Sequence, residues 1–134
     1  MSDMLPATTF SISIASPWRD IYAAIWRPEF FPRWASGLAR SDLRRNGDRW
    51  IAQGPEGEVR IRFSDHNDYG VMDHVVDVGQ GVDVYIPLRV IQNGDGAEIL
   101  ITLFRLPDMN DEKFAADAAM MKRDLQTLKT LLES

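Results

Sequence analysis

His74 is the side chain in this sequence best placed to take part in acid–base or hydrogen-bond chemistry. It lies in the segment Val71–Val78, where the residues two positions away on either side, Met72 and Val76, are apolar. In a strand these three residues share one face, so the imidazole is expected among apolar side chains. Burial would favour the neutral ring, which could orient a polar group of a ligand or exchange a proton. A core histidine satisfied by a carbonyl group or a water molecule explains the same pattern.

Other residue types that carry chemistry do not form a recognisable site. The segment Asp65–Gly70 has the composition of a calcium-binding loop, but Tyr69 offers no suitable oxygen ligand, and Val76 stands where a bidentate glutamate is needed. Alternation places Asp73 and His74 on opposite faces of a strand, which argues against a metal cluster. The sequence contains no glycine-rich phosphate loop, nucleophile elbow or zinc-binding helix motif. We therefore expect neither a metal nor a cofactor.

Composition restricts the class of protein further. The chain has 134 residues, of which 45% are hydrophobic, so we expect a single domain over residues 1–134. A net charge of −5 argues against nucleic acid or an anionic membrane as a partner. The absence of cysteine excludes disulfides and thiolate sites. Met1–Thr9 lacks the features of a signal peptide, and no apolar stretch is long enough to span a bilayer, so we expect a cytoplasmic protein.

The N-terminal third predicts one strand and two short helices. Thr8–Ala15 alternates between apolar and polar residues, as a half-buried strand does. Ser16 and Pro17 form a helix start, and the apolar stripe that follows continues to Trp26. Glu29–Ala35 then predicts a second short helix.

The middle of the chain predicts a series of hairpins. Asparagine- and glycine-rich turn signals separate short alternating segments. These segments are Ala39–Arg45, Arg49–Gln53, Glu58–Ser64, Val71–Val78, Val82–Ile91 and Ala97–Arg105. Pro87 lies inside the fifth segment, where it indicates an edge, a bulge or a bend.

One amphipathic helix completes the predicted fold. Asn110 or Asp111 can cap a helix that continues to about Glu133. Its apolar stripe comprises Phe114, Ala118, Met121, Leu125, Leu128 and Leu132. The order of elements favours an α+β fold, with about seven antiparallel strands in one curved sheet. Two short helices follow the first strand, and the long C-terminal helix crosses the concave face and leaves a cavity.

Symmetric turns predict which side chains face this cavity. They align Leu43, Trp50, Ile61, His74, Ile86 and Leu103 in one inward row, and Phe63, Met72, Leu88 and Ile101 in a second. The opposite face carries Arg40, Arg44, Arg49, Arg60 and Arg62, which form either a solvated face or a docking surface for an acidic partner. Tyr85, Leu100 and Phe104 also fall on this outer face.

Several motifs resemble those of one protein superfamily. Ala15-Ser16-Pro17, Ile21-Tyr22 and the run from Phe31 to Trp34 are similar to the opening of START/SRPBCC proteins, which have the helix-grip fold of the birch-pollen allergen and of polyketide cyclases. The motifs 70–74, 84–90, 93–96 and 102–105 look like those of a small bacterial polyketide-cyclase-like subgroup. The resemblance implies a hydrophobic cavity between the sheet and the last helix, and it supplies no catalytic set.

The first functional hypothesis is binding of a small hydrophobic, lipid-like or aromatic ligand in this cavity. His74 would orient a polar group of the ligand. The expected lining residues are Trp34, Trp50, Ile61, Phe63, Met72, His74, Ile86, Leu88, Leu103, Phe114, Met121 and Leu125.

Two alternatives stay open from the sequence. The first is an enzyme, a polyketide cyclase, aromatase or dehydratase that uses His74 as its acid or base. The second is a protein-interaction module, in which an exposed apolar patch with Tyr85, Leu100 and Phe104 forms a contact, for example in a homodimer.

Overall fold

The computed structural model describes residues 4–35, 43–54, 57–77, 79, 81 and 83–133. The predicted strand over residues 39–45 therefore lies partly outside the described residues, as does Arg40. The elements of the described residues follow in chain order. They are β1 (Ala7–Ile14), α1 (Trp18–Ile25), the 3-10 helix η1 (Pro28–Arg33), β2 (Arg44–Asn46), β3 (Arg49–Gly54), β4 (Gly57–Phe63), β5 (His74–Asp77), β6 (Asp83–Ile86), β7 (Leu88–Asn93), β8 (Gly96–Phe104) and α2 (Asp111–Glu133).

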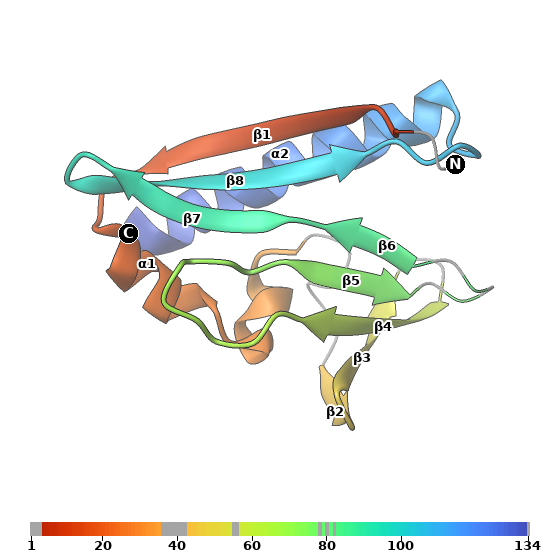
Figure 1. The fold of residues 1–134 in the computed structure, drawn as a ribbon, viewed down its shortest axis with the longest axis horizontal. Coiled ribbons are helices and arrows are strands. Elements are labelled where there is room, and N and C mark those ends of the chain that lie inside the picture. Colours follow the sequence, from red (N-terminus) through yellow and green to blue (C-terminus); the bar gives the residue numbers. More distant parts are fainter. Residues whose placement is uncertain are drawn as a thin grey trace.

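The strands form two antiparallel sheets, which corrects the expectation of one seven-stranded sheet. One sheet has the order β1-β8-β7, and the other has the order β2-β3-β4-β5-β6 (Figure 1). The division occurs at Pro87, which separates β6 from β7 within the segment predicted as one strand. Because proline has no amide proton to donate to a sheet, the chain changes its pairing partner here, from β5 before Pro87 to β8 after it.

The segment before β5 ties the two sheets together. Along β7, the Val90 amide donates to the Gly70 carbonyl at 2.9 Å, and the Met72 amide donates to the Leu88 carbonyl at 2.8 Å. Gly70 has a φ of +72°, and a Cβ at this position would overlap the carbonyl oxygen of Val90. Only glycine allows this close backbone approach.

The predicted strand registers hold in three hairpins and shift in two. Trp50 pairs with Ile61, His74 with Ile86, and Leu88 with Ile101, as symmetric turns predict. His74 pairs with Phe63 rather than with Ile61. The register is therefore shifted by two residues along β4 from the one that a symmetric loop over residues 65–70 predicts. Trp50 faces Arg45 rather than Leu43, because the turn is centred on Gly47-Asp48.

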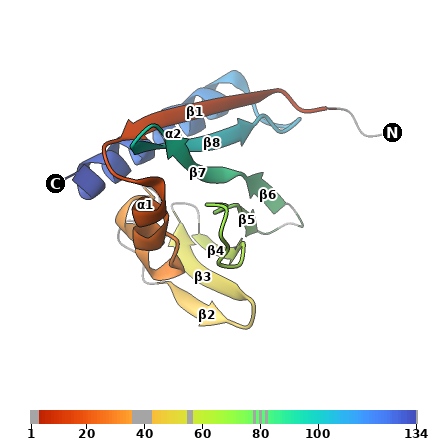
Figure 2. The same ribbon diagram turned by 60° about the vertical axis from the view of Figure 1, so that its left-hand side comes forward.

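The helices α1 and α2 pack on the sheet of β1, β8 and β7, with α1 against β7 and β8. In α1, the residues Ile21, Tyr22 and Ile25 are buried. The helix α2 packs on β1 and β8 through a stripe that includes the buried Leu125 and Leu128, and Figure 2 shows it behind these strands. The α2 stripe predicted from the sequence is therefore part of the main core.

The helix ends follow the local sequence with two corrections. Asn110 caps α2, since its Oδ1 accepts a hydrogen bond from the Lys113 amide at 2.7 Å. At α1 the N-cap position is Pro17 instead of the predicted Ser16, and no side chain caps the helix. The second short helix is a 3-10 helix, and Pro32 within it has no amide proton to donate to the carbonyl of residue 28 as a regular α-helix would require.

Candidate functional site

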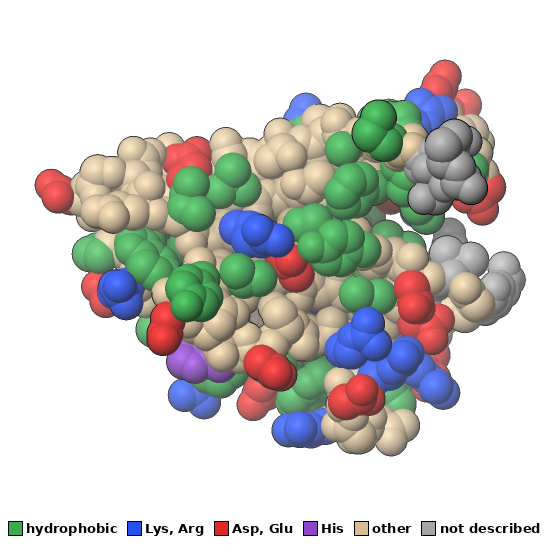
Figure 3. All heavy atoms as spheres, in the orientation of Figure 1, with side chains coloured by type: hydrophobic (Ala, Val, Ile, Leu, Met, Phe, Trp, Pro, Cys, Tyr) green, Lys and Arg blue, Asp and Glu red, His purple; other side chains and the backbone are tan. Residues whose placement is uncertain are grey.

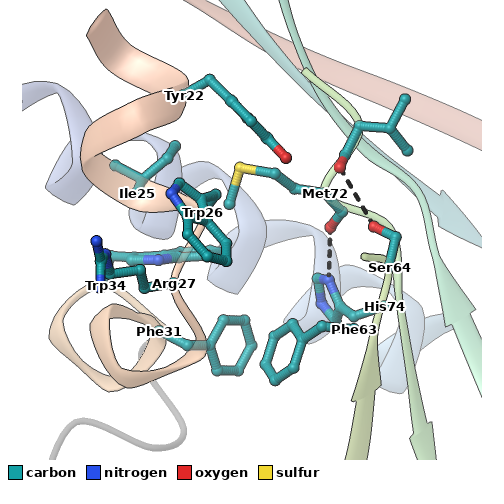
Figure 4. Close-up of a pocket in the computed structure, with 11 residues that line it drawn as sticks. Tyr22, Ile25, Trp26, Arg27, Phe31, Trp34, Phe63, Ser64, Met72 and His74 are labelled. Carbon is teal, nitrogen blue, oxygen red and sulfur yellow. Dashed lines mark hydrogen bonds between the residues drawn. The ribbon is translucent and has the colours of Figure 1, made fainter. Parts of the chain in front are cut away.

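A small pocket lies between the α1–η1 side of the molecule and the strands β4 and β5 (Figure 4). Its walls are mainly aromatic and apolar, with a few polar groups. The lining residues are Tyr22, Ile25, Trp26, Arg27, Phe31, Trp34, Phe63, Ser64, Val71, Met72 and His74. The cavity has a volume of about 10 Å³, which is room for roughly one water molecule.

His74 is the buried ionisable group of this pocket, with only 3% of its surface exposed. Its ring lies edge-on to Phe31, with centroids 5.1 Å apart, and tilted against Phe63 at 5.9 Å. Burial disfavours the imidazolium ion and lowers the pKa of His74 to about 4, although a backbone hydrogen bond from the ring to Met72 and the charge of Asp73 act in the opposite direction. The ring is therefore neutral at neutral pH.

The tautomer of His74 follows from its backbone contact. Nδ1 lies 3.3 Å from the carbonyl oxygen of Met72, which can only accept a hydrogen bond. The proton of the neutral ring is therefore assigned to Nδ1. This assignment leaves Nε2 as the hydrogen-bond acceptor of the ring, and His74 is one of the pocket-lining residues.

Trp34 contributes a second buried polar atom. The residue is 3% exposed, and its ring meets the edge of Phe31 at a centroid distance of 4.9 Å. Its Nε1–H group is buried and has no hydrogen-bond partner among the residues described. An unsatisfied buried donor costs roughly 1–3 kcal/mol, so this group is a candidate contact for a bound molecule.

The segment 65–71 joins the pocket residues Ser64 and Val71 and packs on α1. His66 stacks on Tyr22 with a centroid distance of 5.4 Å and packs against Trp26 at 4.4 Å. The Asn67 side chain donates to the carbonyls of residues 65 and 71 and accepts from the amides of residues 69 and 71. The segment is thus a polar turn closed by its own hydrogen bonds, and the Asn67 amide joins it to α1 by donating to the Tyr22 hydroxyl at 2.9 Å. Within the described residues no group of three metal-ligating side chains gathers.

Four of the predicted lining residues lie together in the pocket, and the others lie elsewhere in the molecule. Trp34, Phe63, Met72 and His74 line the pocket. Trp50 is half-buried on β3, where the guanidinium of Arg45 lies 6.0 Å from its ring. The remaining predicted residues belong to the core or pack against it: Ile61, Ile86, Leu88, Leu103, Phe114, Met121 and Leu125.

The sequence did not predict that α1 and η1 form one wall of the pocket. The apolar stripe of α1 is visible in the sequence, but nothing there shows that its last turn faces β4 and β5. Phe31 and Trp34, three residues apart, indicate one face of a short helix in the same way. The lining residues not predicted are Tyr22, Ile25, Trp26, Arg27, Phe31, Ser64 and Val71.

The fold is that of START-like helix-grip proteins. An uncharacterised protein from Bacillus thuringiensis superposes with a TM-score of 0.77 at 15% identity, over 96% of this chain and 100% of that one. A START superfamily protein from Mycobacterium smegmatis superposes with a TM-score of 0.71 at 11% identity, over 95% and 97% of the two chains. At these identities the likeness concerns the fold alone.

A third similar structure is DynU16, a protein of the dynemicin biosynthetic locus. It superposes with a TM-score of 0.71 at 13% identity, over 96% of this chain and 47% of DynU16. Comparison with protein-family models gives no match, and comparison with curated proteins gives none either. Among the described residues, no helix combines the length and apolar character needed to cross a bilayer.

Proposed function

We propose that this protein binds a small apolar or aromatic ligand in the pocket between α1–η1 and β4–β5. The observation that carries the proposal is the pairing of aromatic walls with two buried nitrogen groups, the His74 ring and the Nε1–H of Trp34, which has no partner among the described residues. Ligand pockets typically combine apolar walls with a few placed polar groups in this way. The START-like fold supports the same kind of function.

Ligand entry requires the pocket to expand. A cavity of about 10 Å³ is far below the roughly 300 Å³ typical of ligand sites. Met72 is half-buried, and Figure 4 shows its side chain between Tyr22 and Trp26. Because methionine is unbranched and adaptable, its movement is the simplest way to open space for a ring.

The location of the site follows from where the core is filled. The space between the sheet and α2, which the sequence suggests as the cavity, contains the buried side chains of Met121, Leu125 and Leu128. The α1–η1 side instead holds the polar groups that a ligand could satisfy. We therefore place the ligand on the α1–η1 side.

His74 acts in this proposal as a hydrogen-bond acceptor. With a pKa of about 4, its imidazole is a weak base at neutral pH, whereas an efficient general base has a pKa near the working pH. A neutral Nε2 can accept a hydrogen bond from a ligand hydroxyl. This favours a binding role over the cyclase, aromatase and dehydratase alternatives.

Titration with 2-naphthol and naphthalene tests the proposal. Calorimetry should show saturable binding of both compounds, and His74→Leu should weaken naphthol binding by about tenfold because the hydroxyl loses its acceptor. Naphthalene binding should change much less, since it makes no hydrogen bond. If neither compound binds the folded protein saturably, the pocket is not a site for aromatic ligands.

A further inference from the structure

The pocket lining includes two residues, Arg27 and Trp34, whose hydrogen-bond donors have no protein acceptor among the described residues. Arg27 lines the pocket, and its guanidinium lies 5.3 Å from the ring centre of Trp26. Among the described residues it has no carboxylate partner. Trp34, a second residue of the pocket lining (Figure 4), has a buried Nε1–H that is also without a partner there.

The pocket offers no anion of its own to these donors. None of its lining residues is Asp or Glu, so the permanent charge on its walls is the positive charge of Arg27. The Ser64 hydroxyl lies 3.2 Å and 3.1 Å from the backbone carbonyl oxygens of Val71 and Asp73, to which it donates. The Ser64 proton is therefore already used within the protein, and the pocket wall is locally positive, although the whole chain has a net charge of −5.

We infer that the ligand of this pocket is an aromatic carboxylate, with its carboxylate bound by Arg27 and Trp34. This inference rests on the proposed function and names the chemical class of its ligand. A planar carboxylate matches the fork of a guanidinium, and charged hydrogen bonds of this kind are the stronger ones. The ring of the ligand would lie against Trp26 and Phe31, in the space that Met72 vacates.

A monoanion fits the site better than a dianion does. One guanidinium compensates one negative charge, and burying a second charge without a partner would be costly. The neutral His74 adds no positive charge at neutral pH. A carboxylate is therefore preferred here to a phosphate dianion.

The chain supplies a matched control for Arg27. Arg33 lies over the ring of Phe30 at 4.8 Å, in the same kind of cation–π contact that Arg27 makes with Trp26. Both arginines are exposed, but Arg33 is not among the pocket-lining residues. Removing the charge of either should leave the fold intact, and only Arg27 should matter for the ligand.

The experiment measures the affinity of 2-naphthoate, 2-naphthamide and naphthalene by calorimetry at pH 7. We expect naphthoate to bind at least about tenfold more tightly than the amide, which has the same shape without the charge. Arg27→Gln should abolish this preference, and Arg33→Gln should preserve it. Trp34→Phe, which keeps a ring but removes the N–H, should weaken naphthoate binding several-fold.

The outcomes separate this inference from the proposed function. Saturable binding of acid and amide with equal affinity overturns the carboxylate assignment and leaves the pocket as a site for neutral aromatics. A preference for naphthoate that persists in Arg27→Gln overturns the assignment of the charged contact. The absence of binding by all three compounds overturns both proposals. Thermal melting of each variant confirms that the proteins compared are folded.

Discussion

At the scale of single residues, His74 is the buried titratable group of the pocket, and its ring is neutral at neutral pH. The ring is enclosed by Phe31 and Phe63, and no described acidic side chain makes a hydrogen bond with it. Burial therefore dominates its pKa. The same effect links the stability of the protein to pH.

We predict that stability falls between pH 7.5 and pH 5 because of His74. Its pKa is about 4 in the folded chain and 6.5 when unperturbed, so the unfolded chain binds more protons in this interval and gains stability relative to the folded chain. The stabilising contribution is complete above pH 6.5 and disappears as the pH falls toward 4. From pH 7.5 to 5 the loss is about 2 kcal/mol. Urea unfolding at both pH values measures it.

The variant His74→Gln provides the comparison for this pH effect. Glutamine does not titrate, so the variant should lose stability at pH 7.5 but show a smaller decrease between pH 7.5 and pH 5. Carboxyl groups with lowered pKa values, such as those of Glu98 and Glu133, contribute below this interval. An equal decrease in the variant and the wild type would show that His74 is not the group responsible.

The sequence predicted the position of His74 more completely than its surroundings. Strand alternation is a local property, so Met72 and His74 could be placed on one inward face from residue order alone. The partner ring of Phe31 comes from η1, far away along the chain. Arg27 carries no sequence signal for a pocket because an arginine near a helix end is most often solvated.

At the scale of elements, a carboxylate connects the two sheets where Pro87 divides them. Asp73 accepts hydrogen bonds from the Leu88 amide and from Arg89 Nε, both at 3.0 Å, and from the Tyr85 hydroxyl and Arg89 Nη2, both at 2.8 Å. Burial alone would raise the pKa of Asp73, but these hydrogen bonds and the charge of Arg89 together lower it. Asp73 thus joins the end of β6 to the start of β7.

We predict that Asp73→Asn destabilises the protein by about 1–2 kcal/mol, because a part-buried charged hydrogen-bond network is lost. The control is Asp117→Asn, which removes one exposed ion pair with Lys113 within α2 and should cost only about 0.3–0.5 kcal/mol. Chemical denaturation of both variants gives the comparison. Equal, small effects would mean that Asp73 does not hold the sheets together.

The sequence predicted most helices and strands, but it did not predict how the strands on either side of Pro87 pair. Proline at position 87 indicated a bend, but its consequence, a change of partner from β5 to β8, depends on the whole sheet. The register shift that pairs Phe63 with His74 also could not be predicted from the local sequence. Asn67 organises a turn whose hydrogen bonds are invisible in a symmetric-turn prediction.

At the scale of the whole molecule, one hydrophobic core extends through two regions of the interior. The region between β1, β8 and α2 is closed core, while the region between α1–η1 and β4–β5 contains the pocket. The fold could be predicted because its order of elements is encoded locally. The position of the pocket could not be predicted from the sequence, because both regions are lined by similar apolar residues.

The outer face gives limited support to the interaction-module alternative. Tyr85 stacks on Phe104 at 6.1 Å, and Tyr85 is 46% exposed. The ion pair of Arg89 with Asp73 lies beside Tyr85, and Figure 3 shows charged side chains among the hydrophobic ones on this face. A homodimer contact here stays a prediction from the sequence.

The central claim is that the ligand binds between α1–η1 and β4–β5. Its most direct test compares two methionine truncations. Met72 lines the pocket, and Met121 is a buried core residue of α2. Each change to alanine creates space and lowers the melting temperature, more so for the more deeply buried Met121. Calorimetric titration with 2-naphthol should show roughly tenfold tighter binding to Met72→Ala and no gain for Met121→Ala. Tighter binding to Met121→Ala alone would contradict the account and place the ligand between the sheet and α2.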